Sequence, residues 1–384
     1  MKIFPFVIID SLRIMIFLLV QVSVAITNFF LIKRLGKFPK AKRCPKVSIL
    51  VPARNEEKTI KNCVSSLLQQ DYNDFEVIVL NDHSIDQTGE ILRNIRSERL
   101  RIINGKPLPM NWTGKSWACQ QLALEANGEF ILFTDADTIH HPLTISYAVD
   151  AIETDKIDLL TAITRNEAIS FGETITIPFP TFCIFTILPL IIAYAFPKST
   201  AFSAANGKFM FFRKEVYEKI GGHATIRNNA VEDIELGKLI KKNNYRWRLF
   251  DISHLVSCRM YNNFSEAVAG FSKNYFALFG YRFLIALFVW FWLALITWHP
   301  LITIGRQVIT NNFNNYYAIV SIIATISLWL LTSLKFGFPF YLFLIYPIII
   351  TISIFIGLRS MVMTILGRTV WKGRRLPKTK IRLI

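Results

Sequence analysis

Long apolar runs occur near both ends of this 384-residue chain, and a mixed pattern fills its middle. Residues 14–32 form a near-continuous apolar run, about as long as the hydrocarbon core of a bilayer requires. Apolar runs return at 283–304, 316–334 and 338–358. We therefore expect an N-terminal transmembrane anchor within residues 1–34 and a C-terminal transmembrane region over residues 280–360.

Residues 45–270 alternate short apolar runs with stretches of helical periodicity, a pattern typical of an α/β domain. The predicted strands are Val47–Ala53, Phe75–Asp82, Leu100–Asn104 and Phe130–Asp137. Helices are predicted after Ile60, over Thr88–Ile95 and over Ser116–Asn127. This order predicts a parallel sheet with right-handed crossovers, in which ligands bind beyond the carboxyl ends of the strands.

Residues 174–196 are also apolar, but three prolines interrupt them. They predict an interfacial or re-entrant segment, with a buried element of the α/β domain as the alternative. Three C-terminal spans after a cytoplasmic domain would place the basic tail 361–384 outside. Basic segments favour the cytoplasmic side, so we expect one of the three to be re-entrant or interfacial. The pattern does not tell which one.

The composition supports a membrane protein, because 52% of the residues are hydrophobic and only 18% are charged. The net charge of +17 is concentrated in two clusters beside apolar segments. They consist of Lys33, Arg34, Lys37, Lys40, Lys42, Arg43 and Lys46, and of Arg368, Lys372, Arg374, Arg375, Lys378, Lys380 and Arg382. We expect them to contact anionic lipids on the cytoplasmic side of a cell membrane. No nucleic-acid module accompanies them, so nucleic acid is not an expected partner.

The five cysteines are scattered and form no C-x-x-C pair. This odd number favours neither a disulfide framework nor a zinc site, and it indicates a reducing compartment.

Asp135-Ala136-Asp137, after the apolar run Phe130–Phe133, is the most informative local motif. Two carboxylates this close repel each other unless positive charge lies beside them. A divalent cation that carries a diphosphate would provide it, since hard cations take oxygen ligands from carboxylates and phosphates. On its own, such a triplet is more often a solvated turn.

Four further motifs accompany this triplet in a fixed order. They are Pro52-Ala53-Arg54-Asn55-Glu56, Asn81-Asp82-His83-Ser84-Ile85-Asp86, Gly114-Lys115-Ser116-Trp117-Ala118 and, after the triplet, Glu232-Asp233. Together the five motifs resemble those of the family 2 glycosyltransferases of GT-A fold, over about residues 45–260. The resemblance implies an α/β, Rossmann-like nucleotide-sugar domain and an inverting transfer from a UDP-sugar with a divalent cation, Mn²⁺ or Mg²⁺.

The resemblance also implies roles for individual residues. It makes Asp137 a metal ligand and Asp135 a ligand of the metal or of the ribose. Asp82 would accept a hydrogen bond from uracil, and Lys115 would add positive charge near the ribose and phosphate. The rest of the nucleoside would lie against Pro52, Ala53, Arg54 and Glu56.

Asp233 is the expected catalytic base, because the second residue of the E-D pair holds that role in the family. The alternative for Glu232 and Asp233 is an acidic helix cap. Glu232 would orient the acceptor, and His223 would face phosphate or simply belong to a turn. Arg259, Trp371 and Arg374 are further candidates for the acceptor or phosphate side. The tail Trp371-Lys372-Gly373-Arg374 resembles the ending of single-addition lipid glycosyltransferases, although an interfacial anchor would also have this composition.

These features predict a multi-pass membrane enzyme with a cytoplasmic catalytic domain. It would transfer a sugar, expected to be glucose, to a lipid such as a carotenoid acid, by resemblance to the group that also contains hopanoid-linked and ceramide glycosyltransferases. A processive polysaccharide synthase is the first alternative, but no Q-x-x-R-W motif occurs. An inactive transport or scaffold protein is the second alternative. The presence of all four key aspartates argues against it, namely Asp82, Asp135, Asp137 and Asp233.

Overall fold

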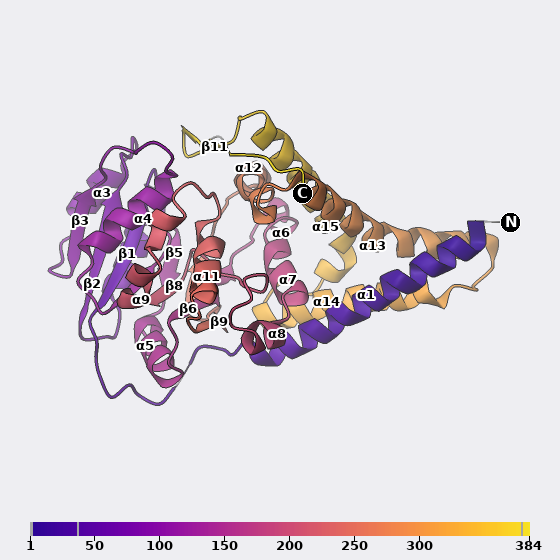
Figure 1. The fold of residues 1–384 in the computed structure, drawn as a ribbon, viewed down its shortest axis with the longest axis horizontal. Helices are drawn as coiled ribbons and strands as arrows, with labels where there is room; N and C mark the ends of the chain where they lie inside the picture. The colour runs from indigo at the N-terminus through magenta and orange to yellow at the C-terminus, as the bar shows by residue number, and fades with distance from the viewer. Residues whose placement is uncertain (1–2, 37, 378) are drawn as a thin grey trace.

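The computed structural model describes residues 3–36, 38–377 and 379–384. Lys37 and Lys378, which belong to the two basic clusters, lie outside the described residues. Figure 1 shows an α/β body on one side and a wedge of long helices on the other, with the N-terminus at the narrow tip of the wedge.

The α/β body contains a seven-stranded sheet, counted over the described residues, in the order β3-β2-β1-β4-β8-β6-β9. The strands are β1 (Val47–Ala53), β2 (Phe75–Asn81), β3 (Leu100–Asn104), β4 (Phe130–Phe133), β6 (Leu159–Ile163), β8 (Met210–Arg213) and β9 (Trp247–Asp251). Strands β3, β2, β1 and β4 are parallel, as predicted. Strand β8, which was not among the predicted strands, runs antiparallel to both β4 and β6. The apolar residues Met210–Phe212 are buried, but an apolar run does not indicate whether a strand runs parallel or antiparallel to its neighbours.

Helices cover both faces of this sheet (Figure 1). They are α2 (Ile60–Leu68), α3 (Thr88–Asn94), α4 (Gly114–Glu125), α5 (Thr144–Thr154), α9 (Lys214–Lys219), α10 (Gly222–Thr225) and α11 (Glu232–Lys242). A small second sheet joins β5 (Thr138–His140), β10 (Val256–Cys258) and β7 (Arg165–Asn166). Because β5 begins directly after Asp137, this second sheet closes over the ends of the main strands. All five cysteines are free.

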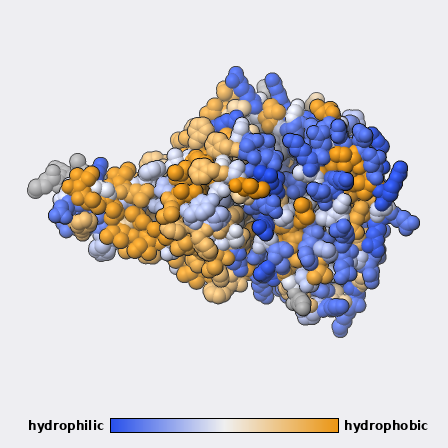
Figure 2. Space-filling model, turned by 180° about the vertical axis from the view of Figure 1, so that it is seen from behind, coloured by the Kyte–Doolittle hydropathy of each residue, from blue (hydrophilic) through white to orange (hydrophobic). Residues whose placement is uncertain are grey.

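Four of the described helices are long and apolar enough to cross a membrane. They are α1 (Ile3–Leu31), α13 (Phe283–Thr310), α14 (Tyr316–Phe336) and α15 (Leu342–Ile365). Apolar residues cover the wedge that they form, whereas hydrophilic residues dominate the α/β body (Figure 2). The predicted apolar runs therefore correspond to these helices.

Residues 174–196 form short helices against the end of α1. They comprise the end of α6 (Phe171–Thr174), α7 (Pro178–Ile187) and α8 (Leu190–Ala195). The amide of Asn28 donates to the carbonyls of Phe185 and Leu188, at 2.8 and 2.7 Å. Ile187 and Ile191 remain half exposed, at 51% and 57%. The segment is thus neither a straight span nor wholly buried.

Helix α15 begins and ends on the side of the α/β body (Figure 1). At the end of α14, the Lys335 ammonium donates to the carbonyls of Phe29 and Ile32, both at 2.8 Å, and α15 begins six residues after Phe336. Near the other end, the Ser360 hydroxyl accepts from the Phe276 N–H at 2.9 Å, just after α12 (Phe264–Asn274). The short 3₁₀ turn η1 (Ala277–Phe279) follows.

The chain beyond α15 returns to the α/β body. It forms a hairpin of β11 (Val370–Trp371) and β12 (Arg374–Arg375). The two turn residues, Lys372 and Gly373, have φ angles of +46° and +77°. Positive φ at both central positions suits the twist of a two-residue hairpin turn, and glycine tolerates it readily.

Candidate active site

Three of the predicted motifs meet at one edge of the main sheet. Strands β2, β1 and β4 are neighbours, and Ala53 at the end of β1 lies opposite Asn81 at the end of β2. The Thr134 N–H donates to the Leu50 carbonyl at 3.1 Å, which fixes the start of the Asp135–Asp137 loop beside β1. Pro52 and Ala53 end β1, so the nucleoside motifs and the aspartate pair share this edge, as the sequence predicts.

The first two motifs are joined by hydrogen bonds between their loops. The Arg54 guanidinium donates to the Asp82 carbonyl at 2.6 Å. The Asn55 N–H donates to the Ser84 hydroxyl, and the Ile85 N–H donates to the Asn55 side-chain oxygen, both at 3.0 Å. These contacts hold Arg54 and the buried Asp82 in a fixed relation.

Lys115 connects the aspartate triplet with the E-D pair. Its ammonium lies 2.7 Å from Asp135 Oδ1 and 3.0 Å from Glu232 Oε1. Burial opposes the charge of this ammonium, but Asp135 and Glu232 raise the pKa of Lys115 well above its ordinary value. The start of α4 therefore brings together two motifs that are about a hundred positions apart in sequence.

Asp137 has the properties of a candidate cation ligand. Its Oδ1 atom is buried and has no hydrogen-bond partner among the described residues. Burial and the neighbouring Asp135 raise the pKa of Asp137. A hard cation would bind this oxygen and remove the repulsion, so the two aspartates fit a divalent ion. The described residues contain no set of three or more histidine, cysteine or acidic side chains that could hold a metal.

Asp233 is held at the first turn of α11 beside the same cluster. Its Oδ2 accepts from the Gly207 N–H at 3.0 Å, and its Oδ1 accepts from the Ile234 N–H at 2.8 Å. Burial and the adjacent Glu232 raise the pKa of Asp233 to about 6. Glu232 and Asp233 both lie in the first turn of α11, where Asp233 also accepts from a helix N–H, so this geometry fits the helix-cap alternative as well. A carboxylate with a pKa close to neutrality is suited to accept a proton.

His223 lies in the core rather than facing the acidic cluster. Its Nδ1 is 2.7 Å from the Tyr217 hydroxyl, and its ring is 4.9 Å from the Phe133 ring. Burial lowers the pKa of His223 to about 3, so the ring is neutral. We therefore correct the expectation of phosphate contact and assign His223 a packing role.

Arg259 pairs with Glu173 of α6. Its Nη2 lies 3.1 Å from Glu173 Oε1, and the Glu173 side chain has no exposed surface. Although burial alone would raise it, the hydrogen bonds from Arg259, Ile169 and Ser170 lower the pKa of Glu173 to about 2. This pair joins α6 to the segment after β10, and it is separate from the Lys115 contacts.

Two lysines outside the five motifs also lie in the cluster. Lys208 donates to the Asn166 side-chain oxygen. Its positive charge favours the ionised forms of Asp135 and Asp137. Lys273 on α12 lies near Glu232. Burial lowers the pKa of Lys273, whereas the negative charge of Glu232 favours the charged form of the lysine. Lys208 belongs to none of the five motifs, and the pattern of α12 gives no local signal for Lys273.

The C-terminal hairpin also reaches this site. Arg374 donates through both terminal nitrogens to the two carboxylate oxygens of Asp82, with Nη2 3.1 Å from Oδ1. Lys372 forms an ion pair with Glu56. Arg374, expected on the acceptor or phosphate side, thus contacts a residue of the predicted nucleoside side. Trp371 lies under the Lys273 ammonium, 4.3 Å from the ring centre.

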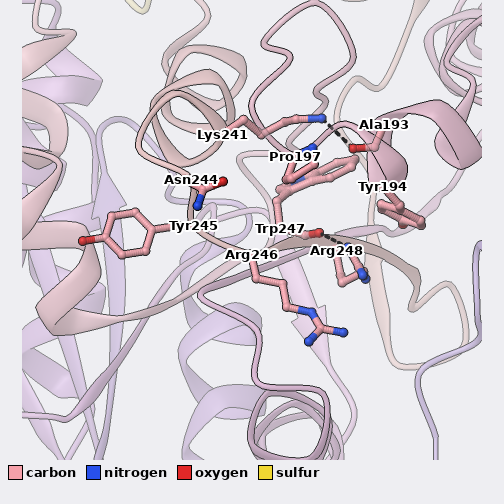
Figure 3. A pocket seen from close by; sticks show the side chains of 9 residues that line it. All are labelled: Ala193, Tyr194, Pro197, Lys241, Asn244, Tyr245, Arg246, Trp247 and Arg248. Carbon is pink, nitrogen blue, oxygen red and sulfur yellow. Dashed lines mark hydrogen bonds between the residues drawn. The ribbon is translucent and has the colours of Figure 1, made fainter.

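A cavity of about 310 Å³ lies elsewhere, between α8, the end of α11 and the start of β9 (Figure 3). Its lining includes Lys241, Trp247 and Arg248 but none of the predicted site residues. The Lys241 ammonium donates to the carbonyls of Ala193 and Phe202, both at 2.8 Å. This cavity is therefore not the predicted site.

Residues 48–221 match the family model described as "Glycosyl transferase family 2". These residues form a family 2 glycosyltransferase domain. Proteins named 4,4'-diaponeurosporenoate glycosyltransferase, from Staphylococcus haemolyticus (strain JCSC1435) and Staphylococcus aureus (strain USA300), are each 27% identical to the chain, over 241 and 240 residues. Each alignment covers 59% of this chain and 60% of the relative, so it spans about three fifths of each staphylococcal protein.

Among solved structures, a mannosyltransferase from Pyrobaculum calidifontis, PcManGT, is similar with a TM-score of 0.52. Its structure is a complex with GDP-Man and Mn²⁺. The match covers 92% of this chain and 98% of that protein at 16% sequence identity, so it shows a shared fold. The α/β domain and the long helices of this chain therefore share their fold with that protein.

Proposed function

We propose that this chain is an inverting, metal-dependent glycosyltransferase that moves a sugar from a UDP-sugar to a lipid acceptor at a membrane. The observation that carries the proposal is the Lys115 bridge between Asp135 and Glu232. It joins the predicted donor side to the predicted base, Asp233, within one buried cluster. A transfer reaction requires this proximity of leaving group and base.

On the donor side, Asp137 and Asp135 would hold a divalent cation together with the diphosphate. When bound, that cation neutralises the charge that develops on the departing phosphate. Lys115 and Lys208 add fixed positive charge beside the same aspartates. Asp82 and Arg54 would orient the nucleoside, since their loops are tied together by the hydrogen bond between them.

On the acceptor side, Asp233 would take the proton of the acceptor hydroxyl or carboxyl group. The acceptor oxygen then forms a bond to the anomeric carbon on the face opposite the diphosphate. As that bond forms, the bond between the anomeric carbon and the phosphate oxygen breaks, and the configuration inverts. The Gly207 and Ile234 N–H groups keep the Asp233 carboxylate in place during this step.

The acceptor is proposed to be a lipid, and more finely a carotenoid acid. The names of the staphylococcal relatives support the carotenoid acid. The long apolar helices beside the cluster support a lipid, because they would keep it in the bilayer next to Asp233. Glucose is the expected sugar. The GDP-Man in the P. calidifontis structure makes GDP-mannose the donor to test against UDP-glucose.

We further propose that α1, α13 and α14 span the membrane and that α15 lies along its cytoplasmic side. Lys335, near the end of α14 and before α15, donates to the carbonyl of Phe29 near the end of α1, and Ser360 near the end of α15 accepts from the Phe276 N–H after α12. With three spans, the glycosyltransferase domain and both basic clusters lie in the cytoplasm, as the positive-inside rule favours.

The test uses membranes that contain the full chain, supplied with labelled UDP-glucose or GDP-mannose and with a carotenoid acid. Mn²⁺, Mg²⁺ or EDTA is added in separate reactions, and the lipid extract is analysed by mass spectrometry. We expect UDP release and a singly glycosylated lipid, with no product in EDTA. A labelled polymer would instead indicate a processive synthase, and the absence of product with either donor would refute the proposed transfer.

A further inference from the structure

The hairpin after the last long helix makes four contacts with the predicted donor motifs. Lys372 pairs with Glu56, and its carbonyl accepts from Arg54 Nε at 3.2 Å. Arg374 makes two hydrogen bonds to the Asp82 carboxylate, 292 positions away in the chain. Two positive side chains of one turn thus lie on two acidic residues of the nucleoside side.

Gly114 shows how closely the hairpin approaches the third donor motif. A Cβ atom at this position would lie 2.9 Å from Arg374 Nη1 and 3.5 Å from Asp82 Oδ2. Arg374 therefore lies between the start of α4 and the end of β2, at the place where the predicted base and ribose would be held. This position is inside the donor site rather than on its rim.

The charges of the cluster explain why such a contact would be required. Six carboxylates gather there, namely Glu56, Asp82, Asp135, Asp137, Glu232 and Asp233. The rest of the site supplies four cations, namely Arg54, Lys115, Lys208 and Lys273. Without the hairpin, and before a divalent cation binds, the cluster has an excess of two negative charges at full ionisation, which opposes the approach of a diphosphate. Lys372 and Arg374 remove that excess.

Binding of Arg374 leaves Asp82 able to recognise a base. Each carboxylate oxygen has two acceptor positions, and Arg374 uses one on each oxygen. The remaining positions can accept an imide N–H, which both uracil and guanine carry. A bidentate guanidinium also fixes the plane of the carboxylate.

We propose that the hairpin completes the donor site in cis, with Arg374 as the residue that positions Asp82 for the base and Lys372 as the residue that holds Glu56 and Arg54 in place. This inference rests on the proposed function and extends it to a segment outside the family 2 glycosyltransferase domain. The hairpin follows α15 directly, and Trp371 rests against Lys273 of α12, which packs on α15. Donor binding is therefore tied to the helices that would hold the acceptor.

The experiment measures binding of UDP with Mn²⁺ to the purified full chain by calorimetry, together with donor KM and kcat. Arg374→Met is the main variant, and Lys372→Met tests the second contact. Arg375→Met is the matched control, because it removes the same charge from the exposed neighbour in the same strand. We expect Arg374→Met to weaken UDP binding and raise donor KM at least tenfold, with a smaller change in kcat. Arg375→Met should change neither more than twofold.

Rescue separates positioning from general damage to the fold. Arg374→Lys keeps the charge but loses the bidentate geometry, so we expect it to recover part of the affinity. If Arg374→Met does not fold, Arg374→Lys and Lys372→Met carry the test.

Tighter UDP binding in these variants would make the hairpin an inhibitory cover and would overturn the inference. Normal transfer with unchanged UDP affinity would also overturn it while leaving the proposed function intact. Failure of the unmodified chain to bind UDP or transfer sugar would instead refute the function on which the inference rests.

Discussion

Replacing Asp233 by Asn tests the proposed chemistry most directly. The change removes the proton-accepting group but keeps its size. With a pKa of about 6, roughly 90% of Asp233 is ionised at pH 7, so the wild-type enzyme works with nearly all of its base available. A positioned general base contributes about 10²–10⁴ in rate, which corresponds to roughly 3–5 kcal/mol of transition-state stabilisation. We therefore expect Asp233→Asn to lose at least about a hundredfold in kcat.

The same substitution should have a small effect on stability. The carboxylate accepts from two N–H groups, those of Gly207 and Ile234, one on each oxygen. An amide has a single acceptor oxygen, so one of these N–H groups would face an NH₂ group. The loss of one such hydrogen bond costs about 1 kcal/mol, too little to explain a hundredfold loss of activity by unfolding.

The assay compares UDP release and glycolipid formation in membranes containing equal amounts of each variant. Glu235→Gln is the matched control, because it removes the same charge from the first turn of α11 and interrupts only a partly exposed pair with Lys238, at 2.7 Å. We expect the control to stay within twofold of wild type. If Asp233→Asn retains more than about a tenth of the wild-type kcat, far above the expected loss, Asp233 is not the base.

Three further predictions concern pH, the metal and stability. Since the base must be deprotonated and burial raises its pKa to about 6, kcat/KM of the wild type should fall as the pH drops below about 6, measured by UDP release in buffers from pH 5 to 8. Asp137→Ala should abolish the gain in UDP affinity that Mn²⁺ gives, because it removes the orphaned carboxylate oxygen, and calorimetry with and without EDTA measures this. Arg259→Met should lower the unfolding free energy, because it leaves Glu173 buried without its cation. Glu173 has a pKa of about 2 in the folded protein and an ordinary pKa of 4.5, so its contribution to stability is present above pH 4.5 and is lost as the pH falls toward 2. Chemical denaturation at pH 7 and pH 3 should therefore show a smaller difference in unfolding free energy between the two pH values in this variant than in wild type.

The amino-acid sequence alone predicted the features that depend on local pattern. A continuous apolar run implies a buried strand or a long apolar helix wherever it lies, so β1, β3 and the apolar core of each long helix were located from their residues. The motifs after β1, β2 and β4 could be assigned to one edge, because parallel neighbouring strands end together. The presence of Asp82, Asp137 and Asp233 in one cluster was expected from the resemblance. Their chemical roles stay predictions.

Only the tertiary structure decided which distant side chains share that edge. Apolar periodicity encodes burial but not direction or partner, so the antiparallel β8 and the turn of α15 back toward the α/β body could not be foreseen. The same limit applies to charge. Lys273 and Arg374 looked like ordinary basic residues of a helix and a tail, yet packing carries them to Glu232 and Asp82. A charge acts over a few ångströms of space, whatever its distance along the chain, and only the fold sets that separation.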